Sequence, residues 1–283
     1  MKLAVSSYSF ESLKKKEGIT QLDCVKKAKE MGFDGIEIVE IQPHDGSSKE
    51  DYAKKIREQA DICGIEISNF CIGANFLSDN LNEEIKRVME NVNYAHILGV
   101  KNMRHDIAYV GNDNYIPFEK ALPIIADATR EVTQYAKTLN IKTCSENHGF
   151  YCQDSERIEA VINAVGDENY RWLGDMGNFL CVDEDPSIGF SRLAPYAIYV
   201  HAKDFIYKKA NMQNPGNMFF MTRGGNYLRG TIVGHGDVPV KSCINALKRV
   251  GYDGYISLEF EGPEYAIDAI KAGKENLERY LKD

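Results

Sequence analysis

Short apolar segments alternate with longer amphipathic segments along the chain. The apolar segments are rich in Ile and Val and are bounded by Gly, Asp or Asn, which is typical of buried strands in a parallel sheet. The predicted strands are residues 3–9, 35–41, 65–72, 102–107, 141–147, 171–176, 198–204 and 255–260. The predicted helices are residues 20–31, 51–63, 81–98, 119–139, 155–165, 240–250 and 264–281, with a short helix at 186–193.

Glycines mark where several of these helices end. The predicted C-cap residues are Gly32, Gly64, Gly99 and Gly251. Residues 31–37 (MGFDGIE) and 250–256 (VGYDGYI) repeat nearly the same order of residue types, in which a helix ends and a strand begins. This repetition indicates a recurring strand–helix unit.

Eight such units in succession predict an α/β fold with a parallel sheet that closes on itself, a (β/α)₈ TIM barrel. The chain has 283 residues, which suits a barrel because such domains typically need about 250. We therefore expect one domain over residues 1–283. The competing fold is an open, doubly wound sheet, and it is disfavoured because no predicted strand is followed by a Gly-x-Gly-x-x-Gly loop.

A long segment at about 205–238 separates the seventh strand from the next helix and shows little periodicity. Long irregular loops inside compact domains are usually lids or binding loops. Arginine, tyrosine and glycine residues are mixed over 223–230, which favours a binding loop at the rim of the barrel, with an unstructured insertion as the alternative.

Composition excludes several classes of protein. The chain is 43% hydrophobic, which is enough for a large core, but it has no apolar run of the roughly 18 residues that a membrane span needs. Its formal charge is −8 and no stretch is strongly basic, which argues against a nucleic-acid partner. The seven cysteines form no Cys-x-x-Cys pair, and the first residues show no signal-peptide pattern. A cytoplasmic protein is expected.

Metal-ligating side chains stand at the ends of four successive predicted strands. These residues are Glu146, Asp175, His201 and Glu259. Because the carboxyl ends of barrel strands meet at one rim, we expect the four groups to converge. Three carboxylates and one imidazole form a hard ligand set, which predicts one divalent cation, Mn²⁺ first, with Mg²⁺, Co²⁺ and Zn²⁺ as alternatives.

The motifs around these residues resemble those of the xylose isomerase-like barrels, over essentially the whole chain. The matching segments are Glu-Asn-His-Gly at 146–149, Asp-x-Gly-Asn at 175–178, His-Ala-Lys-Asp at 201–204, Gly-His-Gly-Asp at 234–237 and Gly-Tyr-Ile-Ser-Leu-Glu at 254–259. Within that family the chain is similar to the sugar phosphate isomerase/epimerase group, which includes ketose 3-epimerases and inosose isomerases. These motifs are more specific for fold and metal site than for substrate.

The resemblance implies roles for individual residues. It assigns the metal to the four residues named above, and it makes Glu146 and Glu259 the acid and base on opposite faces of a bound sugar. It also places Glu37 and His148 near the substrate. One departure is Asn178, because ketose epimerases often carry histidine at that position, and this weakens a transfer of ketose 3-epimerase activity.

Further side chains are candidate substrate contacts. With Glu37, His148 and Asn178 they are Arg104, His105, Lys203, Arg223, Arg229 and His235. Lys203 either binds a substrate oxygen or pairs with Asp204. The two arginines of the long segment suit an acidic or phosphorylated substrate.

Such a site can run three reactions, because a divalent cation beside a carbonyl stabilises the enediolate left when the neighbouring carbon loses a proton. Returning the proton to the other face gives an epimer, returning it to the next carbon gives an isomer, and losing a group from that carbon is β-elimination. The leading hypothesis is a metal-dependent isomerase or epimerase of a small sugar, keto-sugar or cyclitol, in carbohydrate metabolism. A lyase or dehydratase acting on an oxidised sugar or inosose is the alternative.

Two other functions are weaker hypotheses. An apurinic endonuclease shares this type of barrel but holds three zinc ions with several histidines, whereas this chain has six histidines in all and a charge of −8. A non-catalytic sugar-binding barrel would bind without turnover. The expected partner is a small sugar or cyclitol, not a nucleic acid or a membrane, and association into a homo-oligomer is left open.

Overall fold

The computed structural model describes residues 1–110, 115–211 and 213–282. In this part of the chain, eight parallel strands close into a barrel in the order β1-β11-β7-β6-β5-β4-β3-β2. Their bounds are β1 (Lys2–Ser6), β2 (Gly35–Val39), β3 (Glu66–Ile72), β4 (Asn102–His105), β5 (Lys142–Glu146), β6 (Tyr170–Asp175), β7 (Ala197–Ala202) and β11 (Tyr255–Leu258). The predicted TIM barrel is confirmed.

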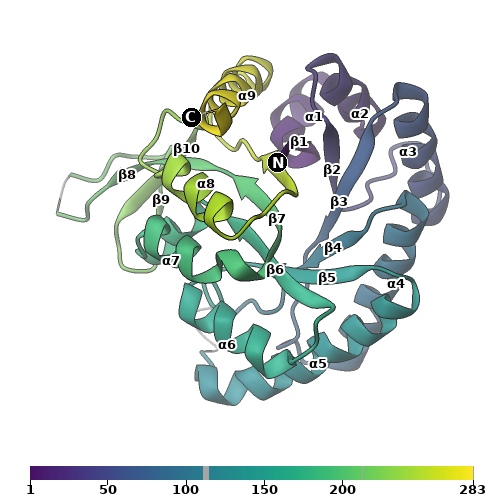
Figure 1. Ribbon diagram of the computed structural model, residues 1–283, viewed down its shortest axis with the longest axis horizontal. Helices are drawn as coiled ribbons and strands as arrows, with labels where there is room; N and C mark the ends of the chain where they lie inside the picture. Colours follow the sequence, from purple (N-terminus) through teal and green to yellow (C-terminus); the bar gives the residue numbers. More distant parts are fainter. Residues whose placement is uncertain (111–114, 212, 283) are drawn as a thin grey trace.

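Helices surround the strands on the outside of the barrel, and the two termini lie on the same side of the molecule, beside β1 and α9 (Figure 1). The helices are α1 (Glu11–Glu17), α2 (Gln21–Glu30), α3 (Lys49–Cys63), α4 (Leu81–Leu98), α5 (Phe118–Thr138), α6 (Ser155–Val165), α7 (Pro186–Leu193), α8 (Val240–Arg249) and α9 (Ala266–Lys282). Gly64 and Gly99 end α3 and α4 with φ angles of 61° and 73°. Because this left-handed conformation suits a residue without Cβ, the two C-caps predicted there are confirmed.

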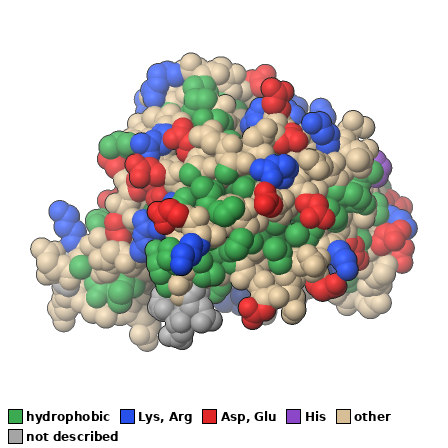
Figure 2. All heavy atoms as spheres, turned by 90° about the horizontal axis from the view of Figure 1, so that it is seen from below, with side chains coloured by type: hydrophobic (Ala, Val, Ile, Leu, Met, Phe, Trp, Pro, Cys, Tyr) green, Lys and Arg blue, Asp and Glu red, His purple; other side chains and the backbone are tan. Residues whose placement is uncertain are grey.

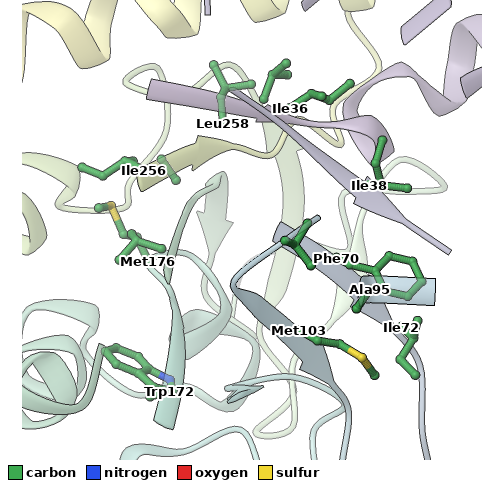
Figure 3. Packing of buried hydrophobic residues seen from close by; sticks show 14 of the residues in the cluster. Ile36, Ile38, Phe70, Ile72, Ala95, Met103, Trp172, Met176, Ile256 and Leu258 are labelled. Atoms are coloured by element: carbon green, nitrogen blue, oxygen red, sulfur yellow. The ribbon is translucent and has the colours of Figure 1, made fainter. Parts of the chain in front are cut away.

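The strands alternate between an outer face that packs under the helices and an inner face that points into the barrel. Ile36 and Ile38 of β2 and Phe70 of β3 belong to the outer core, where Phe70 lies beside Ala95 of α4 (Figure 3). Glu37, between the two isoleucines, therefore points inward. This phase decides which polar side chain of each strand reaches the centre of the barrel.

A separate apolar cluster fills part of the barrel interior. It consists of Cys71, Cys144, Leu173 and Tyr199, all of them buried. The hydroxyl of Tyr199 forms a 2.7 Å hydrogen bond with Ser68. Other side chains that point into the barrel are polar, such as Glu37 and His201. The interior of the barrel is therefore apolar over only part of its height.

The segment after β7 carries a small antiparallel sheet, which its lack of periodicity does not indicate. The strands are β8 (Asp204–Lys208), β9 (Phe220–Met221) and β10 (Tyr227–Thr231), in the order β8-β10-β9. This sheet projects from the side of the barrel (Figure 1). Residue 212, inside the long segment expected over 205–238, lies outside the described residues.

None of the described helices is long and apolar enough to cross a membrane. On the face in Figure 2, acidic and basic side chains are interspersed around a central group of hydrophobic ones, without a stripe of one sign.

Candidate metal centre and active site

Four ligand-type side chains converge at one end of the barrel. Glu146, Asp175, His201 and Glu259 are buried, and one ligand atom from each lies within 4.8 Å of the others. Nδ1 of His201 is 3.5 Å from Oε1 of Glu146, 3.8 Å from Oδ2 of Asp175 and 3.6 Å from Oε2 of Glu259. The strands bring them together because β5, β6, β7 and β11 are neighbours in the barrel, and these residues stand at or just beyond their ends.

The donor atoms of this cluster fit a cation. Oδ1 of Asp175 accepts hydrogen bonds from the backbone N–H groups of Gly177 and Asn178, both at 2.8 Å. Its Oδ2, however, and Nδ1 of His201 are buried without a hydrogen-bond partner. Unpartnered buried polar atoms are rare and need an explanation. Burial, together with the charges of Glu146 and Glu259, raises the pKa of Asp175 to about 7 against the opposing charge of Lys203.

A fifth buried carboxylate fixes the orientation of the imidazole. Both oxygens of Glu37 lie 2.9 Å from Nε2 of His201, and Asn69 donates to one of them at 3.0 Å. Burial opposes ionisation of Glu37, but the charge of His201 and these hydrogen bonds outweigh it and lower the carboxyl pKa. An ionised carboxylate accepts only, so Nε2 of His201 donates to Glu37, and Nδ1 is the ring nitrogen that faces the three carboxylates of the cluster. Glu37 thus contacts the nitrogen of His201 that faces away from the cluster, and it does not line the cavity that the cluster borders.

Arg104 binds one side of the cluster. Its Nη2 lies 2.6 Å from Oε2 of Glu146 and 2.8 Å from Oδ1 of Asp106. The same Asp106 oxygen lies 3.1 Å from Nδ1 of His148. Nδ2 of Asn178 donates to the other oxygen of Glu146 at 2.8 Å. Both oxygens of Glu146 therefore have strong donors.

Lys203 binds the opposite side. Its Nζ lies 2.6 Å from Oε2 of Glu259, 3.2 Å from Oε2 of Glu261 and 3.6 Å from Oδ2 of Asp175. The alternative partner considered for it, Asp204, instead accepts backbone N–H groups of the loop before α8, from Gly234 at 2.8 Å among others. The lysine ammonium therefore belongs to the site.

These groups surround a cavity of about 310 Å³. That size suits a small polyhydroxylated molecule, at the lower end of typical ligand pockets. The lining residues are Tyr8, Val39, Cys71, Arg104, Glu146, His148, His201, Lys203, Glu259 and Glu261. Carboxylates, imidazoles and cationic side chains thus surround one small volume.

Other candidate contacts lie elsewhere. His105 is buried in the outer core, with its ring 5.5 Å from that of Phe76 and 6.3 Å from that of Tyr170. It follows Arg104 directly, and because side chains alternate along a strand, only one of the two can face the cavity. Arg229 pairs with Glu264 at 3.2 Å, outside the cavity lining.

His235 and Arg223 are also outside the lining of this cavity. His235 is exposed in the loop before α8. Arg223 lies beside the turn between β9 and β10 and pairs with Asp154 at 3.0 Å. The long segment therefore places these two basic side chains away from the four convergent ligands.

Asp106, Tyr8 and Glu261 are among the residues that line or support the site but were not singled out by the sequence. Asp106 could have been found, because it stands two residues beyond Arg104 and alternation gives both the same face. Tyr8 follows β1 in a short 3₁₀ helix (Ser7–Phe10), where no strand-end pattern applies. Glu261 stands two residues beyond Glu259, so that alternation gives both the same face, and it is a partner of Lys203.

Comparison with known proteins places the chain in a family. Residues 25–282 match the model of the xylose isomerase-like TIM barrel family, and the chain belongs to that family. An inosose dehydratase of Histophilus somni (strain 129Pt) is 22% identical over 253 residues, which cover 84% of this chain and 81% of that protein.

Solved structures share the fold. The structure of L-ribulose 3-epimerase superposes with a TM-score of 0.75 at 15% identity, over 99% of this chain and 95% of that one. A xylose isomerase-like TIM barrel protein from Mycobacterium smegmatis in complex with magnesium gives a TM-score of 0.74 at 16% identity, over 99% and 97% of the two chains. The resemblance to this family, with epimerase and dehydratase members, is confirmed.

Proposed function

We propose that this protein is a divalent-metal-dependent enzyme that removes a proton from the carbon next to a carbonyl group of a small keto-sugar or cyclitol. Glu146, Asp175, His201 and Glu259 would hold the metal, with Mn²⁺ or Mg²⁺ preferred because the set is mostly carboxylate. When bound, the metal supplies Lewis-acid stabilisation of the negative charge that develops on substrate oxygen. The magnesium complex of the Mycobacterium smegmatis relative supports this assignment.

Among the reactions open to this site, we favour elimination of water over epimerisation. The observation that carries this choice is the pair of Glu259 and Lys203, whose Oε2 and Nζ atoms lie 2.6 Å apart. Elimination needs a group that accepts the carbon-bound proton and one that protonates the leaving hydroxyl. A carboxylate and an ammonium group side by side supply both. The 22% identity to an inosose dehydratase supports the same class of reaction.

The proton transfers balance within this pair. Glu259 takes the proton as the C–H bond breaks, and Lys203 gives a proton to the hydroxyl as the C–O bond breaks, so that water leaves and a C=C bond forms. Glu259 then returns its proton to Lys203 across the 2.6 Å contact, and both groups regain their starting states. Arg104 and His148, on the other side of the cavity, would bind substrate oxygens.

Isomerisation or epimerisation is the second candidate. It is favoured by the convergence of Glu146 and Glu259 from strands that β6 and β7 separate in the barrel. A proton added by Glu146 to the face opposite Glu259 would give the epimer. Against it, both Glu146 oxygens already accept from Arg104 and Asn178, which leaves this carboxylate poorly placed to exchange protons.

The test is a screen of inososes and keto-sugars in deuterated water with protein loaded with Mn²⁺ or Mg²⁺. Elimination predicts deuterium uptake next to the carbonyl and a product lighter by one water, whereas an isomerase or epimerase would conserve mass. Glu259→Gln should abolish both signals. Lys203→Met should keep deuterium exchange but slow water loss by about 100-fold or more. Lys208→Met, in β8 and outside the cavity lining, is the matched control.

Each outcome of this screen has a definite meaning. Exchange with a mass-conserving product moves the assignment to the second candidate. No exchange with any inosose or keto-sugar contradicts the proton-transfer proposal as a whole. Equal loss of exchange and elimination in Lys203→Met would mean that the lysine only positions Glu259.

A further inference from the structure

A second cavity of about 660 Å³ opens beside the catalytic one. Its described lining comes from three parts of the chain: residues on either side of 111–114, the segment after β5 with the start of α6, and the end of β9 with the turn that follows it. The described residues that line it are Tyr109, Val110, Tyr115, Gly149, Phe150, Tyr151, Arg157, Met221, Thr222 and Arg223. The chain itself connects the two cavities, because His148 lines the first and Gly149, the next residue, lines the second.

The second cavity presents aromatic and thioether surface to solvent. Tyr109, Tyr115 and Met221 are 66%, 65% and 59% exposed, and Phe150 is 39% exposed. Large apolar side chains gathered in a hollow usually mark a binding site. Phe150 also has a φ of 63°, a left-handed conformation that is uncommon outside glycine. Such backbone strain persists where the surroundings hold it and often lies at functional sites.

The cationic groups of this cavity already have partners. The guanidinium of Arg157 lies 5.1 Å and 5.2 Å from the ring centroids of Phe118 and Tyr151, and Nη1 donates to the Tyr151 carbonyl at 2.6 Å. Arg223 pairs with Asp154 at 3.0 Å. Because neither cation needs an anion from the ligand, the occupant should be uncharged.

The remaining polar group on the turn is also occupied. The hydroxyl of Thr222 donates to Asp183 at 2.8 Å and accepts from the backbone N–H of Asn226 at 2.9 Å. A second sugar ring would need several hydrogen-bond partners, and the Thr222 hydroxyl is already engaged by Asp183 and Asn226. A flat apolar ring needs only the faces of Tyr109, Tyr115 and Phe150.

We propose that the second cavity is a subsite for an uncharged aromatic substituent carried by the substrate. This inference rests on the proposed function, because it takes the reacting ring to lie among Glu259, Lys203 and His148. The substrate class would then be an aryl-substituted sugar or cyclitol, with the reacting ring in the 310 Å³ cavity and the aryl group in the 660 Å³ cavity.

Binding measurements on the full-length, Mn²⁺-loaded protein test the subsite without turnover. The probes are phenyl β-D-glucopyranoside, methyl β-D-glucopyranoside and cellobiose, compared by isothermal titration calorimetry. We expect the phenyl glucoside to bind about tenfold or more tightly than the other two, since an aromatic contact adds stabilisation beyond its buried area. Tyr109→Ala and Met221→Ala should remove most of this advantage and leave methyl glucoside binding unchanged.

Tyr265→Ala is the control, because this tyrosine is 54% exposed and lines neither cavity. The proposal is overturned if phenyl and methyl glucosides bind alike, if neither binds, or if cellobiose matches the phenyl compound. It is also overturned if sedimentation shows a dimer that Tyr109→Ala dissociates while the phenyl preference persists. Glu259→Gln should keep the phenyl preference while losing proton exchange, so failure of the subsite and failure of the proposed reaction are distinguishable.

Discussion

Glu37 and His201, which are 164 residues apart in the sequence, form a buried pair in which both carboxylate oxygens lie 2.9 Å from Nε2. The pair joins β2 to β7 across the barrel interior. It leaves Nδ1 of His201 facing three carboxylates. Carboxylate–imidazole pairs of this kind fix ring orientation and raise the basicity of a metal ligand.

Replacing Glu37 should therefore weaken metal binding. Glu37→Gln turns the anion into an amide that accepts more weakly, and we expect Mn²⁺ affinity to fall by about 10- to 100-fold. Calorimetric titration of the metal-stripped protein measures this. Glu30→Gln, an exposed change of the same kind on α2, should have no effect. Unchanged affinity in Glu37→Gln would show that the pair serves only the fold.

Gly174, which directly precedes Asp175 in β6, lies so close to two aromatic side chains that it should not tolerate a side chain of its own. A Cβ added at Gly174 would lie 2.7 Å from the Trp172 ring and 3.1 Å from Phe190. We expect Gly174→Ala to destabilise the protein by about 1–3 kcal/mol, because overpacking a dense core forces neighbours to shift. Urea unfolding measures this. If Trp172→Phe does not relieve part of the cost in the double variant, the contact with Trp172 is not its cause.

Asp183 should hold the turn between β9 and β10 in place. Its carboxylate accepts from the Gly224 backbone at 2.6 Å, the Thr222 hydroxyl at 2.8 Å and the Asn226 amide at 2.6 Å. Asp183 has a φ of 62°, which asparagine tolerates, so Asp183→Asn changes the hydrogen bonds and spares the backbone.

We expect Asp183→Asn to weaken this turn locally by about 1–3 kcal/mol, because one acceptor oxygen becomes a donor. Faster limited proteolysis between β8 and β10, with little change in global unfolding, would show it. The exposed Asp79→Asn should be cleaved at the wild-type rate. Equal proteolysis of wild type and Asp183→Asn would contradict the proposed anchoring.

His105 should make the fold sensitive to mild acid. Burial is the main cause that lowers its pKa to about 4, against hydrogen bonding to the Asp106 backbone. Between about pH 6.5 and about pH 4, the imidazole is protonated in the unfolded chain but neutral in the folded chain. The free energy of unfolding therefore falls as the pH drops toward about 4. This loss of stability is at most about 3 kcal/mol, and it is absent above the pKa of the unfolded chain.

Urea unfolding between pH 4 and pH 7 (a range set by the two pKa values of about 4 and about 6.5), with the metal chelated throughout, measures this effect. His105→Phe cannot ionise, so its stability should depend less steeply on pH than that of the wild type. Identical slopes for the two proteins would mean that His105 is protonated in the folded state or that other groups dominate.

The barrel and the convergence of four ligand-type side chains could both be predicted from the sequence. Local patterns suffice for this, because helix ends, apolar strands and strand-end carboxylates are written in consecutive residues, and a parallel barrel collects all strand ends at one rim. Because side chains alternate along β4, only one of Arg104 and His105 can face the cavity, and the sequence predicts which one as soon as one residue of the strand is known to face inward.

The other features could not be predicted from local patterns, because they depend on which distant residues meet. The pairing of Glu37 with His201 follows from barrel closure, and the pairing of Lys203 with Glu259 follows from the neighbouring positions of β7 and β11. The small sheet after β7 and the second cavity arise from loops with no periodicity of their own. Their shape is set by side chains such as Asp183, whose partners lie some 40 residues away.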